Sequence, residues 1–206
     1  MRIDFLELEG FRNYDREAAD FDSRCNVICG ENAQGKTNLL EALVYLSRGK
    51  SPRARTDREM IGFQEESARL AVRVASRERE FRVQADLFRG RRRRITVNQV
   101  PIKTNAALGD VYHTVLFQPE DLDLIREGAA ARRRFLDTAL CQLRPRYAAA
   151  LAGYERAREQ KTRILRDFGQ RPDLLEALPE FNQQMIRFGA ALIQYRNQFC
   201  LRLSEI

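Results

Sequence analysis

The sequence predicts an α/β fold with a P-loop, an antiparallel β meander and, after these, an all-α helical hairpin. Three observations support this. The string G-x-x-x-x-G-K-T at residues 30–37 lies between a short apolar segment and an amphipathic stretch. Residues 69–100 alternate apolar and polar side chains, which is typical of strands. From residue 140 onward, apolar residues recur three and four apart, which is typical of helices.

The chain before the P-loop contains three predicted strands. Apolar residues alternate with charged residues at 3–8, and a second strand runs through 18–21, with a turn around Asn13 and Asp15. The segment Cys25–Cys29 (C-N-V-I-C) is short and mostly apolar, and Gly30 follows it, so we expect a buried strand that leads into a loop. On this strand Cys25 and Cys29 share one face as small buried residues. No C-x-x-C pair and no histidine at ligand spacing indicates zinc.

The segments after the P-loop alternate between helices and strands. Residues 37–46 have helical spacing, and the meander at 69–100 has turns near Arg77–Glu80, Gly90 and Asn98–Gln99. A short helix from about Asn105 precedes an apolar strand at Val111–Phe117. Gln118 follows that strand, and Pro119 opens a further helix with acidic residues in its first turn.

The last part of the chain is helical throughout. Two heptad-like stretches, 140–168 and 181–203, are separated by the Gly/Pro-containing segment 169–173, which predicts an antiparallel hairpin. Two helices that each face a core would give the same pattern. The apolar rhythm still runs where the chain ends at Ile206, so we expect it to be part of a longer protein.

The P-loop predicts a site for the phosphates of ATP. Gly30 and Gly35 permit backbone angles that turn successive N–H groups toward an anion, and the following helix directs its positive end at the same point. Lys36 is expected to reach the β- and γ-phosphates, and the Thr37 hydroxyl to ligate Mg²⁺. The predicted nucleotide-binding residues of the loop are Gly30, Glu31, Asn32, Ala33, Gln34, Gly35, Lys36, Thr37 and Asn38.

Hydrolysis needs more groups than this motif supplies. A carboxylate that holds Mg²⁺ ordinarily follows four apolar residues in a Walker B strand, and no such string follows Lys36. Phe135-Leu136-Asp137 is too short to serve. Gln118, at the end of a predicted strand, is instead the candidate for positioning water and Mg²⁺. We therefore interpret the chain as half of a split site, with a degenerate NTPase as the alternative.

The charge favours an anionic partner. Lys and Arg total 36 against 29 Asp and Glu, which gives a net charge of +7. The candidate DNA-binding residues are Lys50, Arg53, Arg55 and Arg58, and, in the run 91–94, the alternate pair Arg91 and Arg93. A charged sheet edge is the alternative for the run 91–94, and salt bridges at the base of the hairpin are an alternative for Arg132–Arg134. No aromatic residues interleave with these clusters, so we expect recognition of the DNA backbone with a strong salt dependence.

Nothing in the sequence indicates export or membrane insertion. The first ten residues lack the apolar region of a signal peptide, and no apolar run approaches the length of a membrane span. We therefore expect a cytoplasmic protein without a membrane partner.

Five stretches carry a resemblance to a known family. They are Gly10–Tyr14, Gly30–Leu43, Arg55–Ile61, Leu116–Leu122 and Arg132–Asp137. In this order they resemble RecF-type DNA-repair ATPases. The layout of a P-loop, a later strand that ends in Gln, and a helical insertion is similar to that of an ABC-type ATPase head. The resemblance implies that residues 1–131 are the N-terminal part of such a head and 132–206 a helical arm, with the signature and Walker B motifs lying after the arm.

The resemblance also implies function. RecF-type proteins bind ATP and Mg²⁺, dimerise around ATP, bind single-stranded or gapped DNA, and hydrolyse ATP weakly. They support RecA loading with RecR and RecO, and so serve replication, repair and the SOS response. Arg12 and Asn13 fall where related heads contact the nucleotide phosphates, although a charged residue and a turn former between strands would account for them equally well. Gln118 and the segment Gln160–Arg163 depart from the family pattern.

Two other functions remain open. An SMC-type head that tethers DNA would also have a P-loop and a helical insertion, and a much longer heptad segment would indicate it. A scaffold that binds nucleotide without hydrolysing it would have no Walker B carboxylate pair anywhere.

Overall fold

The computed structural model describes residues 1–76, 79–124, 126 and 128–205. It divides into two compact units, Met1–Leu116 and Phe117–Ile206. The sequence places the boundary between the ATPase head and the helical arm at residues 131 and 132, and this boundary stays a prediction. No described helix combines the length and the apolar character needed to cross a membrane.

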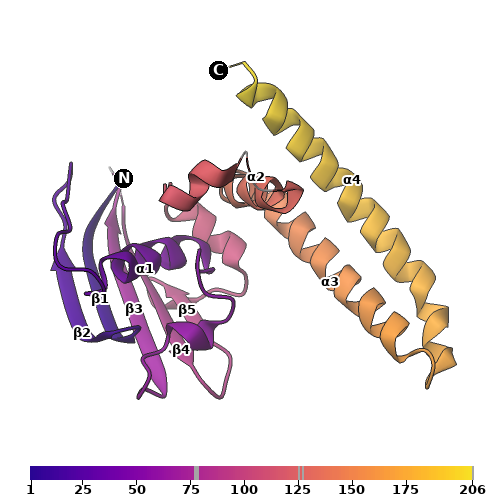
Figure 1. Cartoon of the computed structure of the whole chain (residues 1–206), viewed down its shortest axis with the longest axis horizontal. Coiled ribbons are helices and arrows are strands. Elements are labelled where there is room, and N and C mark those ends of the chain that lie inside the picture. Colours follow the sequence, from indigo (N-terminus) through magenta and orange to yellow (C-terminus); the bar gives the residue numbers. More distant parts are fainter. Residues whose placement is uncertain (77–78, 125, 127, 206) are drawn as a thin grey trace. The chain divides into compact units, whose positions relative to one another are not determined.

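The first unit contains one six-stranded antiparallel sheet (Figure 1). Its order is β2-β1-β3-β4-β5-β6, so each strand after β2 pairs with its neighbour in the chain or with β1. The strands are β1 (Arg2–Phe11), β2 (Tyr14–Asp20), β3 (Ser67–Ala75), β4 (Glu80–Phe88), β5 (Arg94–Val97) and β6 (Val100–Pro101). The predicted meander is therefore confirmed, and Asn98 and Gln99 form its last turn with positive φ. The predicted turn at Arg77–Glu80 lies partly outside the described residues.

Helix α1 (Lys36–Arg48) packs its apolar face against this sheet. Leu39, Ala42, Tyr45 and Leu46 are buried, which confirms the helical spacing seen in the sequence. Gly49 ends the helix in the left-handed conformation, and its N–H donates to the Tyr45 carbonyl at 2.7 Å. This packing holds α1 against β3 and β4, and Asn13 of the β1–β2 turn accepts a hydrogen bond from Asn38 at the start of the helix.

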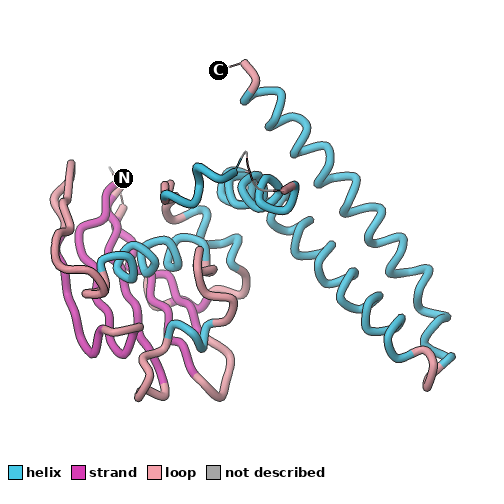
Figure 2. Tube along the Cα trace, in the orientation of Figure 1, coloured by secondary structure: helices cyan, strands magenta, loops and turns pink. Residues whose placement is uncertain are grey.

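Two predicted strands are absent from the described structure. Cys25–Cys29 and Val111–Phe117 have no strand conformation and are drawn as loops in Figure 2. The predictions that Cys25 and Cys29 are buried are also wrong, because both are exposed, as is Val115 with 99% of its surface accessible. A strand needs a hydrogen-bonded neighbour, and no described segment pairs with either of these two. Apolar composition alone therefore does not produce a strand here.

Short 3-10 helices flank the second of these segments. The helix expected near Asn105 is η2 (Asn105–Asp110), and Pro119 opens η3 (Pro119–Leu124), as predicted. A further 3-10 helix, η1 (Asp57–Met60), follows α1 and lies beside the end of β1, where the Arg12 N–H donates to the Met60 carbonyl at 2.8 Å.

The second unit is helical. After η3 it contains α2 (Ala129–Leu143), α3 (Pro145–Asp167), η4 (Pro172–Ala177) and α4 (Leu178–Leu203). Helices α3 and α4 lie side by side in opposite directions (Figure 1), which confirms the predicted hairpin. Leu140, Tyr147, Ala150 and Leu192 form its core, and the Lys161 ammonium donates to Asn182 Oδ1 at 2.8 Å. The lysine at the seam is thus satisfied by a polar partner on the facing helix.

Candidate nucleotide-binding site

The backbone of the P-loop has the shape that its glycines predict. Gly30 has φ +152°, Ala33 +67° and Gly35 +100°. Positive φ at Ala33 and Gly35, two residues apart, is the type of backbone that turns neighbouring N–H groups to one side as an anion-binding nest. Of these three residues, Ala33 is the one that carries a side chain and still has a positive φ.

The start of α1 leaves room for an anion. Gly35 is the N-cap residue, and no side chain caps the helix there. The unsatisfied N–H groups of the first turn, together with the helix dipole, therefore favour a negatively charged group at this end. A Cβ atom at Gly35 would lie 2.7 Å from Asn13 Oδ1 and 2.9 Å from Tyr14 Cζ, so only glycine fits this close approach. The residues present thus fit a nucleotide phosphate group.

Lys36 lies over the loop. Its ammonium nitrogen is 2.7 Å from the Gly30 carbonyl oxygen and 2.6 Å from that of Glu31. An ammonium group has three donors, so one N–H remains for a phosphate oxygen. Thr37 is exposed at the same end of the helix, as a ligand of a bound metal would need to be.

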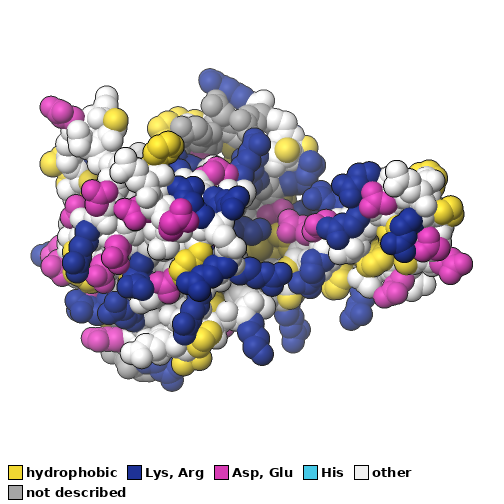
Figure 3. Space-filling view, turned by 90° about the horizontal axis from the view of Figure 1, so that it is seen from below, with side chains coloured by type: hydrophobic (Ala, Val, Ile, Leu, Met, Phe, Trp, Pro, Cys, Tyr) yellow, Lys and Arg dark blue, Asp and Glu magenta, His cyan; other side chains and the backbone are white. Residues whose placement is uncertain are grey.

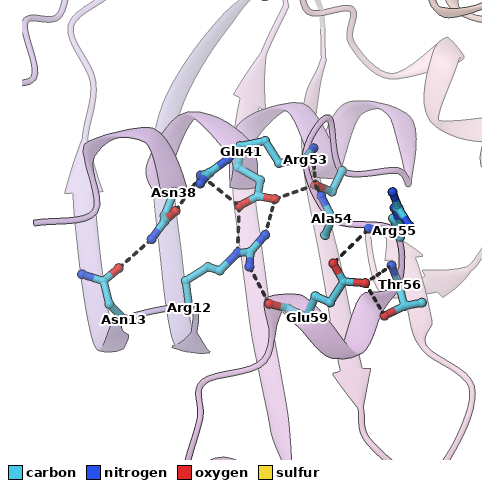
Figure 4. Close-up of polar contacts among 10 residues, drawn as sticks. Arg12, Asn13, Asn38, Glu41, Arg53, Ala54, Arg55, Thr56 and Glu59 are labelled. Carbon is cyan, nitrogen blue, oxygen red and sulfur yellow. Dashed lines mark hydrogen bonds and ion pairs between the residues drawn. The ribbon is translucent and has the colours of Figure 1, made fainter. Parts of the chain in front are cut away.

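Two asparagines brace the loop against the β1–β2 turn. Asn38 Nδ2 donates to Asn13 Oδ1 at 2.8 Å (Figure 4). Asn13 Nδ2 in turn donates to the Gln34 carbonyl at 3.3 Å. Both residues were predicted to contact nucleotide. The described structure gives them a shared structural role, since they connect α1, the loop and the turn; direct contact with nucleotide stays a prediction.

Arg12 is held by a carboxylate that sequence analysis missed. The Arg12 guanidinium donates to both Glu41 oxygens at 2.8 and 2.9 Å and to the Glu59 carbonyl at 2.6 Å. Glu41 lies on α1 and is buried, with a side-chain exposure of 0%. The signal for it was a glutamate on the apolar side of the P-loop helix, since a buried carboxylate needs a partner. The predicted contact of Arg12 with phosphate stays a prediction, and its observed partner is Glu41.

The same carboxylate reaches the basic segment after α1. The Ser51 hydroxyl donates to Glu41 Oε1, and Arg53 lies 3.9 Å from Glu41 Oε2 and donates to Asn38 Oδ1 at 3.0 Å. Arg53 is therefore tied to the residues that brace the P-loop, as Figure 4 shows.

Glu59 closes this segment with a capping box. Its carboxylate accepts from the Thr56 hydroxyl and from the N–H groups of Arg55 and Thr56. These hydrogen bonds, with that of the Thr56 hydroxyl foremost, lower the pKa of Glu59.

The predicted metal ligands lie in different units. Thr37 belongs to the first unit, whereas Gln118 belongs to the second, where its backbone N–H donates to Asp121 Oδ2 at 2.8 Å. Within the described part of the chain, no three His, Cys, Asp or Glu residues form a group that could hold a metal. Metal binding by Thr37 and Gln118 stays a prediction.

The predicted DNA-binding residues have unequal freedom. Lys50 and Arg55 are exposed, whereas Arg58 Nε donates to the Arg89 carbonyl at 2.7 Å. Arg93 is half-buried: it forms an ion pair with Asp57 at 3.0 Å and donates to Asn105 and the Tyr45 hydroxyl. Figure 3 shows basic side chains exposed across the face drawn, so charge alone does not identify a DNA-binding surface. These assignments stay predictions.

Comparison with known proteins places the chain in context. The model of a family described as "AAA domain" matches residues 6–184. The chain is 38% identical over 206 residues to the DNA replication and repair protein RecF of Agathobacter rectalis and 36% identical to that of Lachnoclostridium phytofermentans. Each alignment covers 100% of this chain and 57% of the relative, so the chain spans little more than half the length of these curated proteins.

Solved structures of RecF are also similar to this chain. A structure of the recombination mediator protein RecF with ATP, in the RecFOR pathway, has a TM-score of 0.89 at 28% identity and covers 98% of this chain and 54% of that one. A structure from work on the ATP-driven dimerisation of SMC ATPases has a TM-score of 0.56 at 20% identity, which shows a shared fold alone. The expected resemblance to RecF-type proteins and the predicted fold class are confirmed.

Proposed function

Because the chain belongs to the AAA domain family and is similar to RecF proteins throughout its length, we propose that it is the ATP-binding part of a RecF-type DNA-repair ATPase. In this function, ATP binding controls how the protein associates with single-stranded or gapped DNA. The loop at residues 30–37 carries the proposal, because its backbone, its uncapped helix start and Lys36 all direct positive charge to one point.

Each P-loop group has its own part in binding. Backbone N–H groups from Gly30 to Asn38 would surround the phosphates, and Lys36 would neutralise their charge. The Thr37 hydroxyl would ligate Mg²⁺, and Gln118 would join it when the protein is assembled. Bound MgATP would supply the γ-phosphate, and its presence or loss would control how the protein associates with DNA.

The network behind the loop supports coupling to DNA. Asn38 touches Asn13, which braces the loop, and Arg53, which belongs to the exposed basic segment 50–58. A phosphate in the loop and a phosphate at Arg53 would therefore act on one connected set of side chains. Coupling between two sites requires a physical connection of this kind.

ATP hydrolysis and assembly belong to the whole protein. This chain contains no Walker B or signature string, so we expect it to bind ATP without appreciable hydrolysis. The complete protein would form an ATP-dependent homodimer and act as a weak, DNA-dependent ATPase in the cytoplasm. Its expected partners are RecR- and RecO-type mediators, with which it would support RecA loading, replication and the SOS response.

An SMC-type head that tethers DNA is the second candidate, since the fold is shared with SMC ATPases. A nucleotide-binding scaffold without hydrolysis is the third. The three differ in how ATP affects the oligomeric state and DNA binding.

Light scattering of the protein tests the proposal. The mass should be measured with MgATP, with ADP and for Lys36→Ala, each with and without gapped DNA. Lys161→Ala is a matched control, because it removes one positive charge from the helical hairpin and leaves the P-loop intact. We expect a dimer with MgATP that gapped DNA stabilises, no dimer with ADP or for Lys36→Ala, and wild-type behaviour for the control.

A monomer in every condition, with DNA bound equally well, would overturn the ATP-gated function. It would leave a DNA-binding module that is independent of nucleotide. A dimer that persists for Lys36→Ala would point to a scaffold instead.

A further inference from the structure

The first unit contains a basic cavity outside the P-loop. Its volume is about 440 Å³, and it lies between η1, the turn from β4 to β5, and the segment 102–105. Six of its lining residues are basic: Arg58, Arg89, Arg91, Arg92, Arg93 and Lys103. Among the described lining residues, Asp57 is the one carboxylate. This excess of positive charge in a concave site favours an anionic ligand.

Two of the arginines form the frame of the cavity. Arg93 forms an ion pair with Asp57 at 3.0 Å, which uses the one carboxylate, and it also donates to Asn105. Arg89 donates to the carbonyls of Glu65 at 2.6 Å and Gly62 at 2.8 Å. Both guanidinium groups therefore have fixed positions and hold the surrounding loops in place.

Arg92 and Lys103 are not used in this way. Both are exposed, and neither forms a hydrogen bond or an ion pair with any other described residue. They share the cavity with four further basic groups, so their charges repel unless an anion offsets them. The side chains of these two residues are therefore available to donate hydrogen bonds to a bound anion.

Arg91 limits what kind of ligand the cavity can recognise. Its guanidinium carbon lies 3.7 Å from the centroid of the Phe88 ring, so it covers one face of that ring. Phe88 is the one aromatic residue among the described lining residues. Arg91 thus occupies a ring face on which a base could stack, whereas six basic side chains offer donors to charged oxygens.

We propose that this cavity binds phosphate oxyanions of a nucleic-acid backbone through Arg92 and Lys103, with Arg91 at its rim. The inference rests on the proposed DNA-binding function and assigns that function to a particular place. The planar guanidinium and the compact ammonium both donate charge-assisted hydrogen bonds to phosphate. Binding is independent of base sequence, because the contacts are to the backbone.

The test compares two charge reversals of equal size. Arg92→Glu/Lys103→Glu changes the cavity, and Arg16→Glu/Arg24→Glu changes exposed arginines outside its lining by the same net charge. Affinity for a labelled gapped duplex is measured by fluorescence anisotropy, with MgATP, over a series of salt concentrations. Binding of a fluorescent ATP analogue to each variant checks that the P-loop unit remains folded.

We expect the cavity variant to bind DNA about tenfold more weakly or worse at low salt. Its slope of log affinity against log salt should be smaller by about two, since about one counterion is released per phosphate contact. The control should lose less than about threefold and keep its slope. Both variants should bind the ATP analogue as the wild type does.

Equal losses in the two variants would overturn the cavity site, since net charge alone would then explain the effect, while DNA binding itself would stand. Absence of DNA binding by the wild type would overturn the proposed function as well. Free nucleotide is the other source of phosphate. If Lys36→Ala retains ATP binding that disappears when Arg92→Glu/Lys103→Glu is added, the cavity holds free nucleotide, and the backbone assignment is wrong.

Discussion

At Gly35 the backbone has φ +100°, and the amide of Asn13 lies against the position that a side chain would occupy. Both features arise because this residue is the N-cap of α1 and also the point where the loop meets the β1–β2 turn. Behind it, Glu41 is buried and accepts from Arg12 and Ser51. Single residues thus determine the shape of the loop and hold it against the sheet.

Gly35→Ala should weaken ATP binding by about tenfold or more. The methyl group would collide with Asn13, and the left-handed backbone would be strained by about 1–3 kcal/mol. Titration with a fluorescent ATP analogue measures the loss. Gly90→Ala is the control, because nothing lies within 4 Å of a Cβ atom there. Equal affinity for the two variants would contradict the steric argument.

Glu41→Gln should lower the free energy of unfolding by about 3 kcal/mol, because it leaves the part-buried Arg12 guanidinium without its counter-charge. Urea unfolding followed by circular dichroism measures this change. In Asp4→Asn, which breaks the exposed ion pair with Arg2, we expect a loss below about 1 kcal/mol. If both substitutions cost the same, Glu41 is not the anchor of this network.

Among the helices and strands, some form from local sequence signals, and others require a pairing partner from elsewhere in the chain. Helix α1 has its own signals, a glycine at each end and an apolar stripe, and it forms as predicted. The segments Cys25–Cys29 and Val111–Phe117 have apolar composition but no paired neighbour in the described structure, and they are loops. In the hairpin, Gly153 on α3 meets the Phe188 ring on α4, so the two helices approach closely.

Gly153→Val should destabilise the helical unit by about 1–3 kcal/mol, because a Cβ atom there would lie 2.6 Å from Phe188 Cζ. Thermal unfolding measures the shift. Affinity for the ATP analogue should stay at the wild-type value, because the P-loop belongs to the other unit. Gly169→Ala, with no atom within 4 Å of the new methyl group, should leave stability nearly unchanged. A stable Gly153→Val hairpin would show that the ring moves aside freely.

At the scale of the whole molecule, the chain is two compact units with a net positive charge. Each unit contains buried tyrosines. Burial is the main cause that raises the pKa of Tyr45, Tyr112 and Tyr147 above the ordinary value of 10.0. For Tyr147 the hydrogen bond to Asp137 adds to this effect. These hydroxyl groups therefore stay protonated in the folded protein where an unfolded chain begins to lose the proton.

The free energy of unfolding should consequently fall as pH rises above about 10. Below that value both states hold the proton, and above it the unfolded state releases it, so folding becomes less favourable. For Tyr112 alone the decrease is about 1 kcal/mol per pH unit. Urea unfolding between about pH 8 and about pH 11 measures the slope, and Tyr112→Phe should make it shallower. A slope that Tyr112→Phe leaves unchanged would contradict this assignment.

The sequence by itself determined the P-loop, the helix after it, the meander and the helical hairpin, because each depends on local periodicity, glycine placement and turn chemistry. It also supported the family assignment. The tertiary structure alone decided which apolar segments are strands, since pairing requires a neighbour that composition does not reveal. It likewise paired Arg12 with Glu41 and Arg93 with Asp57, and left Arg92 and Lys103 free at the cavity. Charges distant in sequence reveal their partners only when the chain brings them together.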